Sequence, residues 1–201
     1  MYKFFSSVIF VFLVLYSFAQ KPPQAYIDSL VAYQKKYIAT HEVVKGNDRK
    51  YFKFYKPNAT FSTVAIFTKI NDTATVAIKT TGKKTPVKYF RRYGKISFTI
   101  NGIRQVLTIF QSKDLMSDSL YKDYLFIPFT DATTGVQTYG SGRYIDLSIK
   151  EINGSFFFLD FNKAYNPYCA YSTGYNCPVP PKENRLTVAI EAGEKTFEKP
   201  H

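Results

Sequence analysis

Three acidic side chains and one arginine are the residues in this sequence best suited to acid–base chemistry. Asp131, Asp160 and Glu183 stand in separate polar segments of the second half of the chain, and Arg143 lies between the first two. Two carboxyl groups can supply a general acid and a general base, and an arginine can hold an anion or stabilise developing negative charge. Acidic pairs occur in every domain, so a hydrolase-like enzyme is an alternative rather than the leading hypothesis.

No recognised catalytic or metal motif accompanies these acids. Histidine occurs only at positions 41 and 201, so neither a Ser-His-acid nor a Cys-His arrangement can be placed near them. The glycines of Tyr139-Gly-Ser-Gly-Arg143 resemble the start of a dinucleotide-binding loop, but Ile145 occupies the position of its last glycine. We therefore expect no cofactor and no metal.

The same segments are rich in the side chains from which binding loops are built. Loops that carry Tyr, Asn, Asp and Arg on a rigid scaffold form many ligand sites. The competing interpretation is structural, with these groups stabilising turns or forming buried ion pairs. Strand alternation places Arg143 and Asp146 on opposite faces, so each needs a different partner. The candidate ligand-binding residues are Asp131, Tyr139, Arg143, Asp146, Asp160, Asn162, Tyr165, Asn166, Glu183, Asn184 and Arg185.

The N-terminus has the pattern of a signal peptide. Lys3 precedes an apolar run over residues 4–16, and the small residues Ser17 and Ala19 predict cleavage after position 19. A retained membrane anchor is the alternative, but the run is shorter than the roughly 18 residues that a transmembrane helix needs. No cysteine follows the cut to carry a lipid. We expect residues 20–201 to form one globular domain that is exported, periplasmic or secreted, with no transmembrane segment.

Two cysteines, Cys169 and Cys177, would reach an oxidising compartment after export. They are a candidate disulfide that closes a short loop, worth on the order of 2 to 3 kcal/mol. Two buried thiols and a metal site are the alternatives.

Positive charge is concentrated in one segment. The net charge is +12, yet residues 73–113 carry nine basic residues and no acid. Such a block attracts anionic partners, which for an exported protein are envelope components. Aromatic residues alternate with basic ones over residues 88–93, but an exported chain has little access to nucleic acid, which is not expected as a partner. A solvated basic surface that keeps the protein soluble is the plainer interpretation.

The elements that must position these residues are one helix and a series of strands. Ile27, Leu30, Val31, Tyr37 and Ile38 recur at helical spacing and predict an amphipathic helix over 24–40. Beyond it, residues 50–201 are mainly β. Short runs rich in Tyr, Phe, Val, Ile and Thr predict strands at 50–56, 60–70, 73–80, 87–93, 124–129, 143–150, 155–161 and 186–191.

The clearest local prediction is a hairpin over 95–110. Asn101-Gly102 suits a two-residue type I′ turn and sets Ile100 opposite Ile103. One face then carries apolar side chains, interrupted only by Gln105, and the other face meets water. The predicted core face consists of Ile96, Phe98, Ile100, Ile103, Leu107 and Ile109. An N-terminal amphipathic helix followed by about eight to ten mostly antiparallel strands predicts a β-barrel or sandwich.

Three long segments of the second half resemble a known family. They are RYGKISFTING, LFIPFTDATTGVQTYGSGRYIDL and DFNKAYNPYCAYSTGYNCPVPPKENRLTVAIEAGEK, within residues 88–195. These are similar to the family catalogued as domain of unknown function 1684. The resemblance implies a compact domain, often in exported or envelope-associated bacterial proteins, with no established substrate, cofactor or catalytic residue.

The leading hypothesis is a non-catalytic module of the cell envelope. It would bind an unknown small molecule, glycan-like ligand or anionic envelope component through the loops of the second half, with the basic block adding attraction to anionic surfaces. A structural or assembly role is a further alternative.

Overall fold

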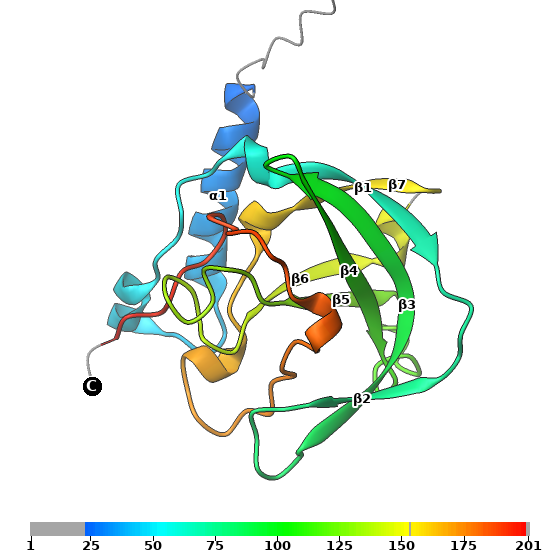
Figure 1. The fold of residues 1–201 in the computed structure, drawn as a ribbon. Coiled ribbons are helices and arrows are strands. Elements are labelled where there is room, and N and C mark those ends of the chain that lie inside the picture. Colours follow the sequence, from blue (N-terminus) through cyan, green and yellow to red (C-terminus); the bar gives the residue numbers. More distant parts are fainter. Residues whose placement is uncertain (1–22, 153, 200–201) are drawn as a thin grey trace, which may run out of the picture.

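A strongly curled antiparallel sheet forms most of the structure, with one α-helix beside it (Figure 1). The computed structural model describes residues 23–152 and 154–199. The predicted signal peptide, residues 1–19, lies outside the described residues. Within those two ranges, no helix has the length and apolar character needed to span a bilayer.

The sheet has seven strands: β1 (Ser62–Lys69), β2 (Thr75–Lys79), β3 (Val87–Ile100), β4 (Ile103–Ser112), β5 (Tyr124–Phe129), β6 (Arg143–Ser148) and β7 (Phe156–Asp160). Their order is β6-β5-β4-β3-β1-β7, and β2 pairs with the first half of β3. The predicted mainly β fold with an N-terminal helix is confirmed as a half-barrel, with fewer strands than the eight to ten expected.

Helix α1 (Gln24–Thr40) has the predicted bounds, and the other helical elements of the described residues are short 3₁₀ helices. The helix begins directly after Pro23, whose carbonyl accepts the Tyr26 amide, and only Leu30 is fully buried. The 3₁₀ turns are η1 (Gly46–Tyr51), η2 (Ala59–Phe61), η3 (Ile149–Glu151), η4 (Phe161–Lys163), η5 (Tyr168–Ala170) and η6 (Lys182–Asn184).

The predicted hairpin forms with the expected register. Asn101 and Gly102 have φ values of 51° and 76°, and Ile100 pairs with Ile103 across the turn. The predicted core face is buried except for Ile103, which is 51% exposed at the tip. The opposite face meets water near the turn, but Thr108 and Phe110 on it are buried as well.

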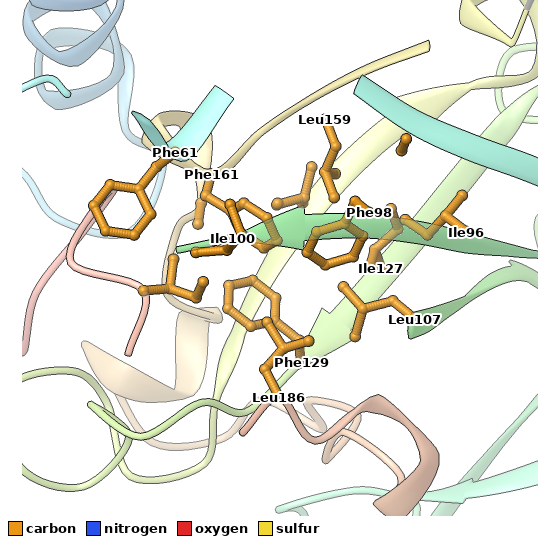
Figure 2. Close-up of a cluster of buried hydrophobic side chains, with 14 of the residues drawn as sticks. Phe61, Ile96, Phe98, Ile100, Leu107, Ile127, Phe129, Leu159, Phe161 and Leu186 are labelled. Atoms are coloured by element: carbon orange, nitrogen blue, oxygen red, sulfur yellow. The ribbon is translucent and has the colours of Figure 1, made fainter. Parts of the chain in front are cut away.

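One face of the sheet encloses the main core (Figure 2). Its fully buried side chains come from β1, β3, β4, β5 and β7, from η4 and from the segment after η6. Among them are Ile96, Ile100, Leu107, Ile109, Leu125, Ile127, Phe129, Leu159 and Ile190. Burial of apolar side chains at about 25 cal/mol per Å² makes this face the principal source of stability.

The opposite face carries a second, smaller apolar cluster at the other end of β3. The register between β3 and β4 shifts between Arg92 and Gly94. Because the extra residue, Tyr93, reverses the side-chain alternation, Phe90 lies on the face opposite to Ile96 although both positions are even. The cluster consists of Ile78, Phe90, Phe110, Phe126 and Tyr144.

Two predicted strands are wrong. Residues 50–56 contain the end of η1, whose first residue, Gly46, has a left-handed backbone with φ 53°. In the rest of this segment, Phe54 forms only an isolated bridge to Glu194. Residues 186–191 show the alternating burial of a strand, but they join no ladder. Their backbone bonds instead to Thr130 and Ala132. Alternating burial shows that every second side chain packs against the core. It does not require the segment to pair with a strand of the sheet.

Candidate functional site

A cavity of about 650 Å³ lies against the second face of the sheet, opposite the main core. Its walls come from α1, from β3 to β6, and from residues 165–178. Nearly half of the residues that line it are aromatic: Tyr33, Tyr37, His41, Phe90, Tyr124, Phe126, Tyr144, Tyr165, Tyr168 and Tyr175. Its volume is in the range of small-molecule sites.

Strands β5 and β6 form the floor because their alternation sends every second side chain away from the core. Leu125, Ile127 and Ile145 enter the main core, whereas Tyr124, Phe126, Tyr144 and Asp146 face the cavity. Phe126 meets Tyr144 edge to face at 4.6 Å and stacks on Phe90 at 5.8 Å. The floor is therefore a packed aromatic surface.

One face of α1 forms the second wall. Tyr33, Tyr37, Thr40 and His41 follow one another at helical spacing, and all line the cavity. The hydroxyl of Tyr33 donates to the Lys163 carbonyl, and that of Tyr37 donates to Glu194 Oε2 at 3.3 Å. These hydrogen bonds fix the helix against the segments that follow β7.

The third wall is a loop fixed at both ends. Tyr165 exchanges two backbone hydrogen bonds with Tyr144 of β6, and Val179 donates to the Lys79 carbonyl of β2. Between these anchors, a disulfide joins Cys169 and Cys177, as predicted. The Tyr144 hydroxyl donates to the Pro178 carbonyl and connects the floor to this wall.

Asp146 is the polar centre of the floor. Its Oδ1 accepts the hydroxyls of Tyr124 and Tyr165, both at 2.7 Å, and no described residue bonds to Oδ2. The side chain lines the cavity and is exposed there. Partial desolvation by the cavity walls raises the pKa of Asp146, and the two tyrosine hydrogen bonds partly offset that rise.

His41 ends α1 as a neutral, buried side chain. Its Nδ1 accepts the Val44 amide at 2.9 Å, so the ring proton is on Nε2, which has no partner among the described residues. Rings of Tyr37, Phe52, Tyr168 and Tyr171 surround the imidazole. Burial lowers the pKa of His41 to about 4, so the ring carries no charge at neutral pH.

Glu194 lies behind the α1 wall. It is fully buried, and it accepts the Asn166 amide and the Tyr171 hydroxyl. Burial raises the pKa of Glu194 to about 7. This carboxyl group holds Tyr37 in place without itself lining the cavity.

Two of the predicted site residues, Arg143 and Asp131, form an ion pair that is buried beside the main core and does not line the cavity. Arg143 Nη2 lies 2.9 Å from Asp131 Oδ2, and both side chains are fully shielded from water. The guanidinium also donates to the carbonyls of Ile190, Ala192 and Glu194. Asp131 Oδ1 accepts the amides of Thr133 and Ile190. This network ties the C-terminal segment to β6.

The other predicted residues fall into three groups. Asp146 and Tyr165 meet in the cavity. Asn162, Asn166 and Asn184 are buried and bond backbone groups of distant segments. The remaining four do not line the cavity: Asp160 caps η4, Glu183 pairs with Arg92, Tyr139 is half-buried, and Arg185 is exposed.

The structure therefore does not assemble an acid–base pair from Asp131, Asp160 and Glu183, which belong to three separate hydrogen-bond networks. Sequence reasoning also missed the α1 wall. The signal was present, because Tyr33, Tyr37 and His41 are spaced by four residues and form one polar aromatic stripe.

The sequence matches the family described as "Protein of unknown function (DUF1684)" over residues 49–195. The chain belongs to this family. The predicted resemblance is confirmed, and the DUF1684 match includes the floor and the disulfide loop of the cavity but not the helical wall. No protein with a curated description matches this chain.

A solved structure shares the fold. It is the solution NMR structure of an uncharacterized protein from Haloarcula marismortui, 28% identical in sequence, with a TM-score of 0.63. The similarity covers 86% of this chain and 95% of the archaeal chain.

Proposed function

We propose that this DUF1684 protein is a non-catalytic binding module that holds a small organic molecule in the aromatic cavity. The observation that carries the proposal is the cavity itself, about 650 Å³ in volume, with aromatic walls and a carboxylate whose second oxygen is free to bind. Aromatic faces contribute apolar contact, and a few polar groups set orientation, which is how small-molecule sites are commonly built.

Binding rather than catalysis fits the composition of the site. The cavity wall holds no serine–histidine or cysteine–histidine pair, since His41 is enclosed by rings and its Nδ1 is occupied. Within residues 23–152 and 154–199, no three His, Cys, Asp or Glu side chains gather as a metal site requires. The disulfide fits the proposed export of the protein.

A blocking substitution tests the proposal. Thr40 lines the cavity at the end of α1, whereas the adjacent Ala39 is exposed and does not. Thermal unfolding would be measured against a panel of sugars, nucleotides, flavins, amines and lipids, where a ligand at 100 times its dissociation constant adds roughly 2.7 kcal/mol. We expect the shift to vanish in Thr40→Trp and to persist in Ala39→Trp. Equal shifts in both variants would place binding elsewhere.

An exposed apolar patch supports a second candidate function, which is binding to a surface of the cell envelope. On the outer face of β7, β1 and β4, five apolar side chains are 44% to 76% exposed: Val64, Ile66, Val106, Phe156 and Phe158. Strand pairing sets Phe158 beside Val64 and Phe156 beside Ile66. Soluble monomers seldom expose contiguous apolar patches of this kind without a binding role.

We propose that this patch docks on an anionic lipid surface. Lys95 and Arg104 are exposed on the same face, opposite Thr68 and Thr99 in the ladder. Apolar side chains enter the interface while nearby cations approach anionic headgroups.

Vesicle sedimentation tests this docking. We expect the protein to pellet with vesicles that contain phosphatidylglycerol and to stay in solution with phosphatidylcholine vesicles. Phe158→Ser should abolish pelleting, whereas Val136→Ser, at a position 81% exposed outside the patch, should not. Equal pelleting of the two variants would exclude the patch.

A further inference from the structure

We infer that the ligand of the aromatic cavity is an organic cation, a primary or quaternary ammonium. This inference rests on the proposed function and deepens it. Asp146, Glu42 and Asp114 contribute three carboxylates to the lining, and Lys88 is the one lysine or arginine on it.

The charge of the cavity opposes that of the protein. The chain has a net charge of +12, yet the cavity has one basic side chain against three acids. Lys88 makes no ion pair with these acids among the described residues, and neutral His41 adds no charge. An anionic ligand would be repelled here, and a neutral one would gain nothing from the field.

Asp146 is prepared to receive a positive group. Both tyrosine hydroxyls bond to Oδ1 of this cavity-lining residue, which fixes the carboxylate and leaves Oδ2 without a partner in the described chain. A carboxylate oxygen that no protein group pairs is available to a positively charged partner. A bound ammonium group supplies that pairing, and the raised pKa of Asp146 should fall when it binds.

The aromatic walls suit the same class of ligand. Tyrosine and phenylalanine rings line the cavity from both sides, from α1 and from the sheet. The negative face of an aromatic ring attracts a cation, and quaternary ammonium groups are commonly held by several such rings. A carboxylate and a ring cage together select a cation with an organic body over an inorganic one.

Matched pairs of probes test the inference. Choline and 3,3-dimethylbutan-1-ol have nearly the same shape, as do tyramine and tyrosol, and only the first of each pair is charged. Isothermal titration should show binding of at least one cation, at least about tenfold tighter than its neutral partner, the factor that corresponds to about 1.4 kcal/mol.

Variants separate the cavity from the general charge of the protein. Asp146→Asn should weaken the cation by about tenfold or more, and Lys88→Gln should strengthen it. Asp28→Asn, which removes an exposed carboxylate of α1 outside the cavity, should leave binding unchanged.

The outcomes distinguish this inference from the proposed function. If neutral partners bind as tightly as cations and Thr40→Trp blocks both, the cavity binds ligands but the charge class is wrong. An anion from the earlier panel that binds and is blocked by Thr40→Trp would overturn the inference in the same way. If neither the probes nor that panel bind in the cavity, the inference and the proposed function both fail.

Discussion

Strand β6 carries two charged side chains, the buried Arg143 and the exposed Asp146, that illustrate two uses of a charged group. Arg143, on the core face, has an ion pair and three carbonyl acceptors within reach, and water reaches none of them. Asp146, on the other face, uses one oxygen for two tyrosines and leaves the other facing a cavity.

The difference shows which group is available to a ligand. A buried ion pair that also has hydrogen bonds to neighbouring carbonyls is costly to break, and it offers little to a ligand. A carboxylate with a free oxygen beside open volume gains by binding. Function is therefore better sought at Asp146, the more accessible of the two.

Removing the arginine should give the largest effect. Arg143→Met leaves Asp131 as an unpaired buried charge and deprives three carbonyls of a donor, so unfolding free energy should fall by roughly 3 to 5 kcal/mol. Urea denaturation measures this loss. Arg185→Met, at an exposed arginine, is the control and should change stability by about 0.5 kcal/mol or less. A similar small loss in both variants would show that the core network contributes little.

Glu194 connects the two regions, because its carbonyl accepts Arg143 Nη1 while its carboxyl group accepts the cavity tyrosine Tyr37. Its pKa of about 7 is above the ordinary 4.5, so the folded state prefers the protonated form. The stabilising contribution of Glu194 is therefore largest below pH 4.5 and is lost as pH rises to about 7. His41, whose pKa falls from 6.5 to about 4, has the opposite slope over most of this window.

Glu194→Gln removes the pH dependence of stability that Glu194 causes and leaves the one that His41 causes. Its stability relative to the unmodified protein should rise by roughly 3 kcal/mol between pH 4.5 and 7, with most of the change complete by pH 7. Denaturation at several pH values measures this difference. A difference that does not change with pH would mean that Glu194 titrates normally.

Local patterns in the sequence were sufficient to predict the helix, the hairpin turn and several strands, but not to predict all of the pairing between segments in the sheet. The bounds of α1, the turn at Asn101-Gly102 and the strand at β5 follow from periodicity and turn chemistry alone. The alternation of Leu186, Val188 and Ile190 also correctly indicates burial. It does not indicate a ladder, because pairing depends on which distant backbone lies alongside.

The cavity could be predicted only in part for the same reason. Asp146 and Tyr165 were candidates because polar loop residues often bind ligands, and both line the cavity. Arg143 and Asp131 were candidates for the same reason, because no local pattern in the sequence shows whether a charged side chain is already paired. The bulge at Tyr93, which turns Phe90 toward the cavity, has no clear signal in composition.

Loss of the disulfide should affect the cavity side more than the core side. Replacing Cys169 and Cys177 by serine frees a short loop, which costs about 2.5 kcal/mol by the chain-entropy estimate. This loop carries Tyr175 in the cavity wall, and Tyr168 directly precedes it, so ligand binding should weaken as well. Comparing unfolding and binding with and without a reducing agent measures both effects. Binding that survives reduction would show that the wall does not need the bridge.

The smallest effect on stability should come from the residue most important for binding. In Asp146→Asn the amide oxygen still accepts both tyrosine hydroxyls, and only a charge is removed. Since the pKa of Asp146 is raised by burial, its carboxylate is destabilising once pH exceeds that pKa. The variant should therefore be equal to or slightly more stable than the unmodified protein at pH 8, by less than about 1 kcal/mol.

Denaturation at pH 3.5 and pH 8 checks the sign, because the advantage of asparagine should develop as pH rises above the ordinary pKa of 3.8. A loss of several kcal/mol would place Asp146 with Arg143 as a structural group, and the contrast between the two faces of β6 would disappear. A small gain in stability combined with loss of cation binding would mean that the free oxygen is retained for a ligand at a cost to the fold.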